Sequence, residues 1–251
     1  MGETSVAPPL PEETPGDSFF SRAMGVFISP GTAFESIARK PDFLAALMVG
    51  VVSTIVFTET MLAKIGIERI VRRSIELSPR AAQFSAEQMD QAVHRGATFG
   101  LILARVSEFV AVPVYILIVA AVGLFIVNLI FGGAATFKAS FSVICYANLI
   151  KLVEAVLGMV VILFGDPDQF NPQNFAPSNA GFFLSPQDTA RPLYIVASSF
   201  DVFTIWFLIV ASLGLSLVSG RKARTLPVFL CFLGLWIVWV LVKIGLSMFG
   251  G

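Results

Sequence analysis

The chain has 251 residues, of which 56% are hydrophobic and 14% charged, and its formal net charge is zero. A soluble globular domain carries about 25% charged residues, so this charge deficit, together with apolar runs of about 20 residues, indicates a polytopic membrane protein. The balanced charge provides no bulk attraction to nucleic acid, which is therefore not expected as a partner.

Residues 1–18 form an acidic, proline-rich stretch that reads MGETSVAPPLPEETPGDS. It has neither the basic n-region nor the apolar h-region of a secretory signal peptide. Such a composition cannot bury enough apolar surface to offset the entropy of ordering. The sequence therefore predicts a disordered tail at 1–18, followed by a membrane domain over 19–251.

A short amphipathic helix is predicted from Ser29 to Lys40. Ser29 is a favourable N-cap and the proline after it suits the first helical position. Phe34 lies on the apolar face, while Arg39 and Lys40 close the helix before a second proline. We expect this helix at the membrane surface, with Phe34 in the interface and the two basic side chains against anionic headgroups.

Five apolar stretches are predicted to cross the bilayer as helices, which gives an all-α bundle with amphipathic surface helices. They lie at about 43–62, 108–131, 139–164, 193–219 and 225–248. The polar interruption between the first two has the periodicity of two amphipathic helices, and Ser85 and Gln88 have capping-box spacing at the start of the second.

The basic turn before the last span, with Arg221, Lys222 and Arg224, places the N-terminus in the cytoplasm by the positive-inside rule. The arginines of the first polar interruption favour the opposite orientation. We give the short turn more weight, because short loops follow the rule best.

Four charged residues fall inside the predicted spans. Lys151 and Glu154 are spaced i, i+3 in the third span, so they share a helix face and can pair. Asp201 lies early in the fourth span and Lys243 late in the fifth, at a similar expected depth. A charge at the bilayer centre costs about 2.5–3.5 kcal/mol on insertion scales. Because of this cost, charged residues inside a span are treated as candidate functional residues. Three interpretations stay open: a neutral network that fixes the bundle, a path for an ion or solute, and a binding patch.

No catalytic or metal-binding pattern accompanies these charges. The sequence contains no HExxH helix, GxSxG elbow or glycine-rich phosphate loop. Cys145 and Cys231 lie in apolar runs without CxxC spacing, and His94 lies outside the spans. We therefore expect no catalytic residue, no metal, no cofactor and no enzymatic activity.

Three stretches carry a family resemblance. A surface helix reading FISPGTAFESIARKPD precedes the first span, FGGAATFKASFSVICYANLIKLV joins the second and third, and SSFDVFTIWFLIVASLGLSLVSGRKAR leads into the basic turn. Together they resemble the Yip family, five-pass membrane proteins named for interaction with Ypt/Rab GTPases. The resemblance covers about Phe19 to Phe249 and looks closest to the bacterial members.

The resemblance implies a non-catalytic adaptor or scaffold that binds other membrane proteins or a second copy, or that organises the bilayer. Eukaryotic relatives act in Golgi and ER trafficking with a cytosolic N-terminus. Their longer N-terminal region recruits GTPases, so the short region here argues against GTPase binding. The expected location is the bacterial cytoplasmic membrane, with the Golgi or ER membrane as the alternative. A small ion or solute transporter is the alternative function, although an odd span count and no visible internal repeat argue against it.

Overall fold

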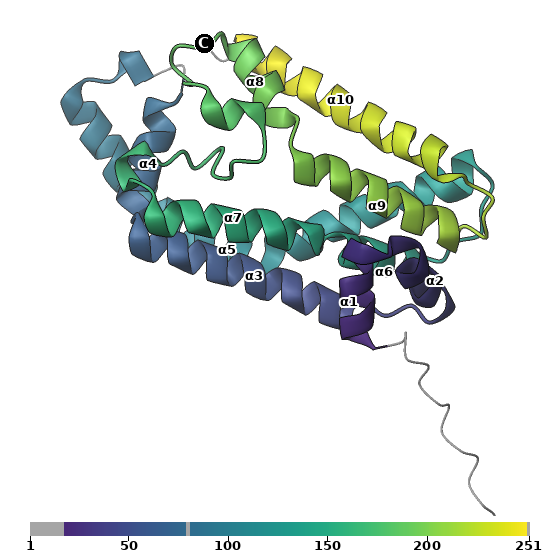
Figure 1. The fold of residues 1–251 in the computed structure, drawn as a ribbon. Helices are drawn as coiled ribbons and strands as arrows, with labels where there is room; N and C mark the ends of the chain where they lie inside the picture. Colours follow the sequence, from purple (N-terminus) through teal and green to yellow (C-terminus); the bar gives the residue numbers. More distant parts are fainter. Residues whose placement is uncertain (1–17, 79–80, 250–251) are drawn as a thin grey trace, which may run out of the picture.

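The computed structural model describes residues 18–78 and 81–249, and the long elements in this part of the chain are all helices (Figure 1). Most of the predicted tail, residues 1–17, lies outside the described residues. The α-helices are α1 (Phe19–Ile28), α2 (Pro30–Arg39), α3 (Leu44–Lys64), α4 (Ile67–Glu76), α5 (Ala86–Phe125), α6 (Phe137–Ala147), α7 (Ile150–Phe164), α8 (Arg191–Ser199), α9 (Val202–Val218) and α10 (Thr225–Phe249). A π-helical turn, Ile126–Ile130, extends α5, and short 3-10 turns lie at Ala81–Gln83, Pro167–Gln169 and Ala180–Phe183.

Four helical stretches among the described residues have the length and hydropathy to cross a membrane. They are Leu44–Lys64, Ala86–Ile130, Phe137–Phe164 and Thr225–Met248. The apolar helix α9 has 17 residues, about 26 Å at 1.5 Å per residue, against a hydrocarbon core of about 30 Å. The protein is therefore an all-α polytopic membrane bundle.

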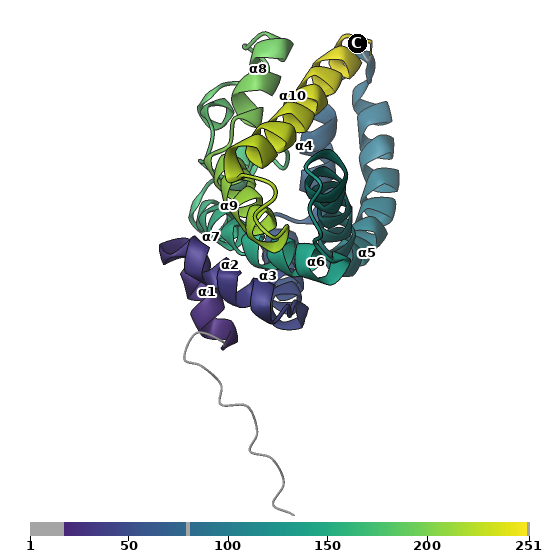
Figure 2. The ribbon, with the colours of Figure 1, turned by 90° about the vertical axis from the view of Figure 1, so that its right-hand side faces the viewer.

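The long helices run roughly along one direction, and smaller helices lie at both ends of the bundle (Figure 1). Helices α1 and α2 lie across one end, where α2 packs on α9 (Figure 2). Helices α4 and α8 lie at the other end, near the finish of α10. The described chain thus begins and ends at opposite ends of the bundle.

Helix α5 is a single element of 40 residues, about 60 Å long, so it extends well beyond the hydrocarbon core. Its start has the predicted capping box, in which the Ser85 and Gln88 side chains each bond the other residue's backbone N–H. Helix α4 packs against its outer half. At Gly96 even a Cβ would lie 2.8 Å from Cγ1 of Val71, so glycine permits this close approach.

The third predicted span is not one regular helix. It divides into α6 and α7 at Asn148 and Leu149, where the backbone changes to i→i+3 hydrogen bonds. The Leu149 N–H donates to the Tyr146 carbonyl at 3.1 Å, and the Lys151 N–H donates to Asn148 at 2.9 Å. Phe137–Phe164 remains one continuous helical stretch through this tighter turn.

The fourth predicted span also differs, because the helix expected from residue 193 is interrupted at Phe200 and Asp201. Asp201 has an extended backbone and its Oδ1 accepts the Thr204 N–H at 2.7 Å. Aspartate at an N-cap satisfies a backbone donor that would otherwise be lost at the start of a helix. Asp201 is therefore the cap of α9 and not a mid-helix charge.

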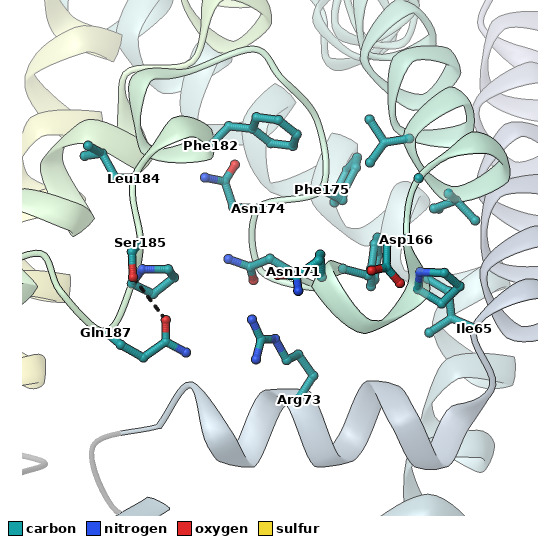
Figure 3. Close-up of a pocket in the computed structure, with 17 residues that line it drawn as sticks. Ile65, Arg73, Asp166, Asn171, Asn174, Phe175, Phe182, Leu184, Ser185 and Gln187 are labelled. Atoms are coloured by element: carbon teal, nitrogen blue, oxygen red, sulfur yellow. Dashed lines mark hydrogen bonds between the residues drawn. The ribbon is translucent and has the colours of Figure 1, made fainter.

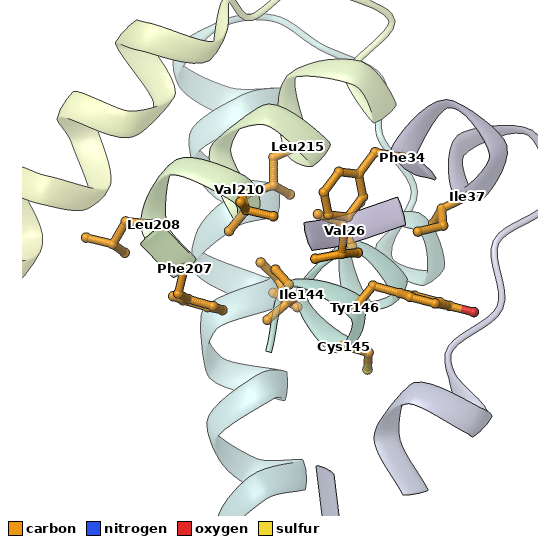
Figure 4. Packing of buried hydrophobic residues seen from close by; sticks show 14 of the residues in the cluster. Val26, Phe34, Ile37, Ile144, Cys145, Tyr146, Phe207, Leu208, Val210 and Leu215 are labelled. Atoms are coloured by element: carbon orange, nitrogen blue, oxygen red, sulfur yellow. The ribbon is translucent and has the colours of Figure 1, made fainter. Parts of the chain in front are cut away.

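The N-terminal hairpin α1–α2 belongs to the protein core. Figure 4 shows Val26, Phe34 and Ile37 among buried side chains of α6 and α9. Phe34 is fully buried, and a Cβ at Gly214 would lie 2.9 Å from its ring. Phe34 therefore does not make the membrane-surface contact expected of it, since its apolar face meets protein and not lipid.

Candidate functional site

A polar cavity of about 450 Å³ lies inside the bundle, between α7, α8, α9, α10 and the loop that follows α7. The four charged residues singled out in the sequence, Lys151, Glu154, Asp201 and Lys243, all line it. We call it the Lys151 cavity. Aromatic side chains form much of the rest of its wall, from Tyr115, Phe175, Phe207, Trp236 and Trp239.

Lys151 is the centre of the charge network in this cavity. Its Nζ lies 2.7 Å from Oε2 of Glu154 and 3.7 Å from Oδ1 of Asp201. It also donates to Oγ1 of Thr204 at 2.9 Å. The predicted i, i+3 pair therefore forms, and it gains a second carboxylate from the cap of α9.

Asp201 ties the long loop between α7 and α8 to the bundle. Its Oδ2 accepts a hydrogen bond from the Ser178 hydroxyl, and the Val202 N–H donates to the Ser178 carbonyl at 3.0 Å. Within the loop, the side-chain amides of Asn174 and Asn179 bond each other twice, at 2.8 and 3.2 Å. These contacts hold the loop over the Lys151 cavity, so the loop forms part of the site.

Lys243 does not pair with Asp201, although the two were expected at a similar depth. Its Nζ donates to the Ser199 hydroxyl at 2.6 Å. Both carboxylate oxygens of Asp201 already accept other hydrogen bonds, from Ser178 and from the Thr204 backbone, and Lys151 supplies the nearby cation. Lys243 thus joins the same cavity through a neutral hydroxyl.

A second charge cluster, not expected from the sequence, lies between α3 and α5. Arg105 of α5 forms an ion pair with Glu59 of α3 and lies 3.4 Å from Glu108 on its own helix. Glu108 is buried, so this arginine neutralises a carboxylate inside the bundle. The i, i+3 spacing of Arg105 and Glu108 was visible in the sequence, but the partner on α3 was not.

A third cluster fixes the N-terminal hairpin to the bundle. Arg22 is only 1% exposed and its guanidinium lies 2.9 Å from a carboxylate oxygen of Asp42. The Tyr146 hydroxyl of α6 donates to the same carboxylate at 2.7 Å. Arg22 also donates to Ser36 in α2 and to the Lys40 carbonyl, each at 3.0 Å. Residues 104 positions apart meet here, which no local pattern predicts.

The Lys151 cavity combines a charge-balanced polar part with an aromatic wall. The charges of Lys151 and Lys243 are balanced by those of Glu154 and Asp201. The buried Ser198 hydroxyl also lines it and has no hydrogen-bond partner among the described residues. Such a space suits water or a small uncharged or zwitterionic solute better than a single ion.

The fold and these clusters define a class: a helical, multi-pass membrane protein whose intramembrane charges pair within the bundle. The model of the Yip1 domain matches residues 24–250, so the chain belongs to the Yip1 domain family. The chain is also similar to the membrane protein YknW of Bacillus subtilis (strain 168), with 26% identity over 223 residues that cover 86% of this chain and 87% of that protein. No solved structure matches the chain. The family expected from the sequence is confirmed.

Proposed function

We propose that this protein is a non-catalytic membrane scaffold that binds other membrane proteins through its spans. We further propose that α9 makes a fifth crossing and that the N-terminus lies in the cytoplasm, in a bacterial cytoplasmic membrane. The main support is that Lys151 has two carboxylates and one hydroxyl around it. Charges compensated in this way fix helix positions, whereas a relay needs groups that can change partners.

The surface that would receive a partner is an apolar groove between the end of α5 and α10, of about 740 Å³. Its lining is formed by Ala121, Val122, Phe125, Ile126, Ile130, Leu230, Cys231, Gly234 and Leu235. A Cβ at Gly234 would meet nothing within 4 Å, so another backbone can approach closely there. The occupant we propose is one transmembrane helix of a partner protein.

Other small-residue faces are already used inside the bundle. Ala46 and Gly50 of α3 are buried, and a Cβ at Gly50 would lie 3.3 Å from Cγ1 of Val112. Ser212 and Ser216 of α9 are buried as well. These small residues thus pack inside the bundle, and the groove beside Gly234 remains for a partner.

Photo-crosslinking in intact membranes tests this proposal. A photoreactive residue at Leu230 should give a discrete product that contains a second membrane polypeptide, and Gly234→Trp should abolish it by filling the groove. Val52→Trp is the matched control, because Val52 is an exposed residue of α3, with 51% exposure. Crosslinking only to lipid, or equal loss with both tryptophans, would contradict a helix-binding groove. A product between two copies of this chain would identify the partner as the protein itself.

The orientation has its own test. Cysteines introduced at Asp188, in the loop before α8, and at Lys222, in the basic turn, are both exposed positions. We expect a membrane-impermeant thiol reagent to label position 188 from outside intact cells and position 222 only after permeabilisation. Labelling of both from one side would refute five crossings.

A transporter remains the second candidate, because the Lys151 cavity is large enough for a small solute. Flux into proteoliposomes, measured for protons, alkali cations and zwitterionic amino acids, separates the two functions. The scaffold proposal predicts no flux above protein-free vesicles. Flux that is abolished by Glu154→Gln, in a variant that still folds, would overturn it.

A further inference from the structure

A second pocket lies at the α4 end of the bundle, and nothing described so far uses it. It has a volume of about 390 Å³ and lies between α4 and the loop that follows α7 (Figure 3). We call it the α4 pocket. Its lining includes Ile65, one residue beyond the candidate span of α3, and Gly165 and Asp166, directly after the span that ends at Phe164. The pocket therefore lies at the depth where hydrocarbon gives way to lipid headgroups.

Arg73 of α4 is the cation of this pocket. In Figure 3 its side chain extends from the helix toward Asn171 and Gln187 in the loop. Its Nη1 lies 3.3 Å from Oε2 of Glu76, a partly exposed neighbour on the same helix. Its Nε is buried and has no hydrogen-bond partner among the described residues. The side chain as a whole is 25% exposed, so its guanidinium stays accessible to the oxygens of a phosphate or carboxylate.

Other polar groups in the loop are mostly satisfied within the protein. Asn171 donates to the Tyr194 hydroxyl at 2.9 Å and accepts from the Gln173 N–H. Asn174 is paired with Asn179. Arg73 is thus the lining group with the clearest unmet capacity to bind an anion.

The lining also contains the Asp166 carboxylate and several uncharged polar side chains, and the remainder is apolar. Ile162 and Phe170 are buried there, and Val161, Phe175 and Leu184 contribute further apolar surface. A ligand that fits must therefore carry an anionic group beside a hydrocarbon portion. The volume accommodates a headgroup and its first carbons rather than a complete lipid.

We propose that the α4 pocket binds the phosphate of a membrane phospholipid, with Arg73 as its ligand and the start of an acyl chain against Ile162 and Phe170. Three observations carry this: the depth of the pocket, the buried unpaired Nε and the apolar side of the lining. Glu76 is 42% exposed at its side chain and turns to water when phosphate takes its place.

Native mass spectrometry of the full chain in detergent tests the proposal. Short-chain phosphatidylethanolamine, phosphatidylglycerol and inorganic phosphate are added in separate arms. We expect a bound phospholipid whose affinity falls about tenfold in Arg73→Gln, because a charge-assisted pair is lost. Arg69→Gln is the matched control: Arg69 is on the same helix, half exposed and 3.2 Å from Asp168.

An equal loss of phospholipid affinity in both variants would show only a general attraction between charges and would refute the proposed site. If inorganic phosphate binds and neither phospholipid does, the ligand of the pocket is free phosphate and the phospholipid proposal is wrong. If Arg73→Gln does not fold, Arg73→Lys keeps the charge but not the paired donors, and an unchanged lipid affinity there would also refute the geometry.

Discussion

Replacing Arg22 by methionine tests the cluster that holds the N-terminal hairpin. Methionine keeps the length and apolar stem of the side chain but removes the guanidinium. The variant loses the ion pair with Asp42 at 2.9 Å and the hydrogen bonds to Ser36 and to the Lys40 carbonyl. Helix α1 should then separate more easily from α2 and from the segment at Lys40 and Asp42.

The size of the effect follows from the burial of the two partners. Removing one member of a buried ion pair costs about 3–5 kcal/mol. Asp42 is 50% exposed at its side chain and keeps the Tyr146 hydroxyl, so water can solvate it after the change. We therefore expect the lower end, about 3 kcal/mol. At about 2–4 °C per kcal/mol for a chain of this size, the melting temperature falls by about 6–12 °C.

Thermal unfolding of the detergent-solubilised protein measures this shift. Arg39→Met is the control, because Arg39 lies on α2 but is exposed, and exposed substitutions usually change stability by less than about 0.5 kcal/mol. A double-mutant cycle with Asp42→Asn isolates the ion pair. If Arg22→Met and Arg39→Met have the same melting temperature, the reasoning from burial fails.

Three further substitutions test the packing and the charge clusters by the same melting assay. Gly158→Leu should cost about 1–3 kcal/mol, because a Cβ there would lie 2.5 Å from the Phe175 ring, whereas Gly245→Leu meets open space and should not. Asp201→Ala should cost more than the roughly 1 kcal/mol of a lost N-cap, because Lys151 also loses a carboxylate. Asp201→Asn keeps a capping oxygen and should therefore be less destabilising than Asp201→Ala. Equal melting temperatures of the two variants would exclude a capping role. Arg105→Gln should destabilise by about 2 kcal/mol because Glu108 stays buried, and a melting temperature equal to the wild type would show that water reaches that carboxylate.

The existence of the helices could be predicted from hydropathy, but their interruptions could not. Mean hydropathy over a window of about 19 residues does not register a change in backbone hydrogen bonding at two residues. The turn at Asn148 and the cap at Asp201 therefore lay hidden inside apolar runs. The Asp201 cap did leave a local signal, an aspartate three residues before a threonine, which is the spacing of the bond that forms.

The candidate site was predictable to the extent that it is local. Lys151 and Glu154 lie three residues apart, so helix geometry alone brings them together. Arg22, Asp42 and Tyr146 meet only after the bundle has formed, and their separation in the sequence gives no sign of it. The apolar face of Phe34 posed a different difficulty, because an amphipathic pattern does not reveal whether its partner is lipid or protein.

The loop between α7 and α8 is built into the bundle and is no ordinary connection. In this loop the Phe175 ring packs against Phe57 of α3, with ring centroids 4.8 Å apart. The Ser178 hydroxyl is hydrogen-bonded to Asp201, the cap of α9. Epitope tags and length changes are normally placed in such extramembrane segments because they are tolerated there. An insertion near Phe175 would disturb the contacts of the loop with α3 and α9, so the exposed turn at Lys222 is the better site for a tag.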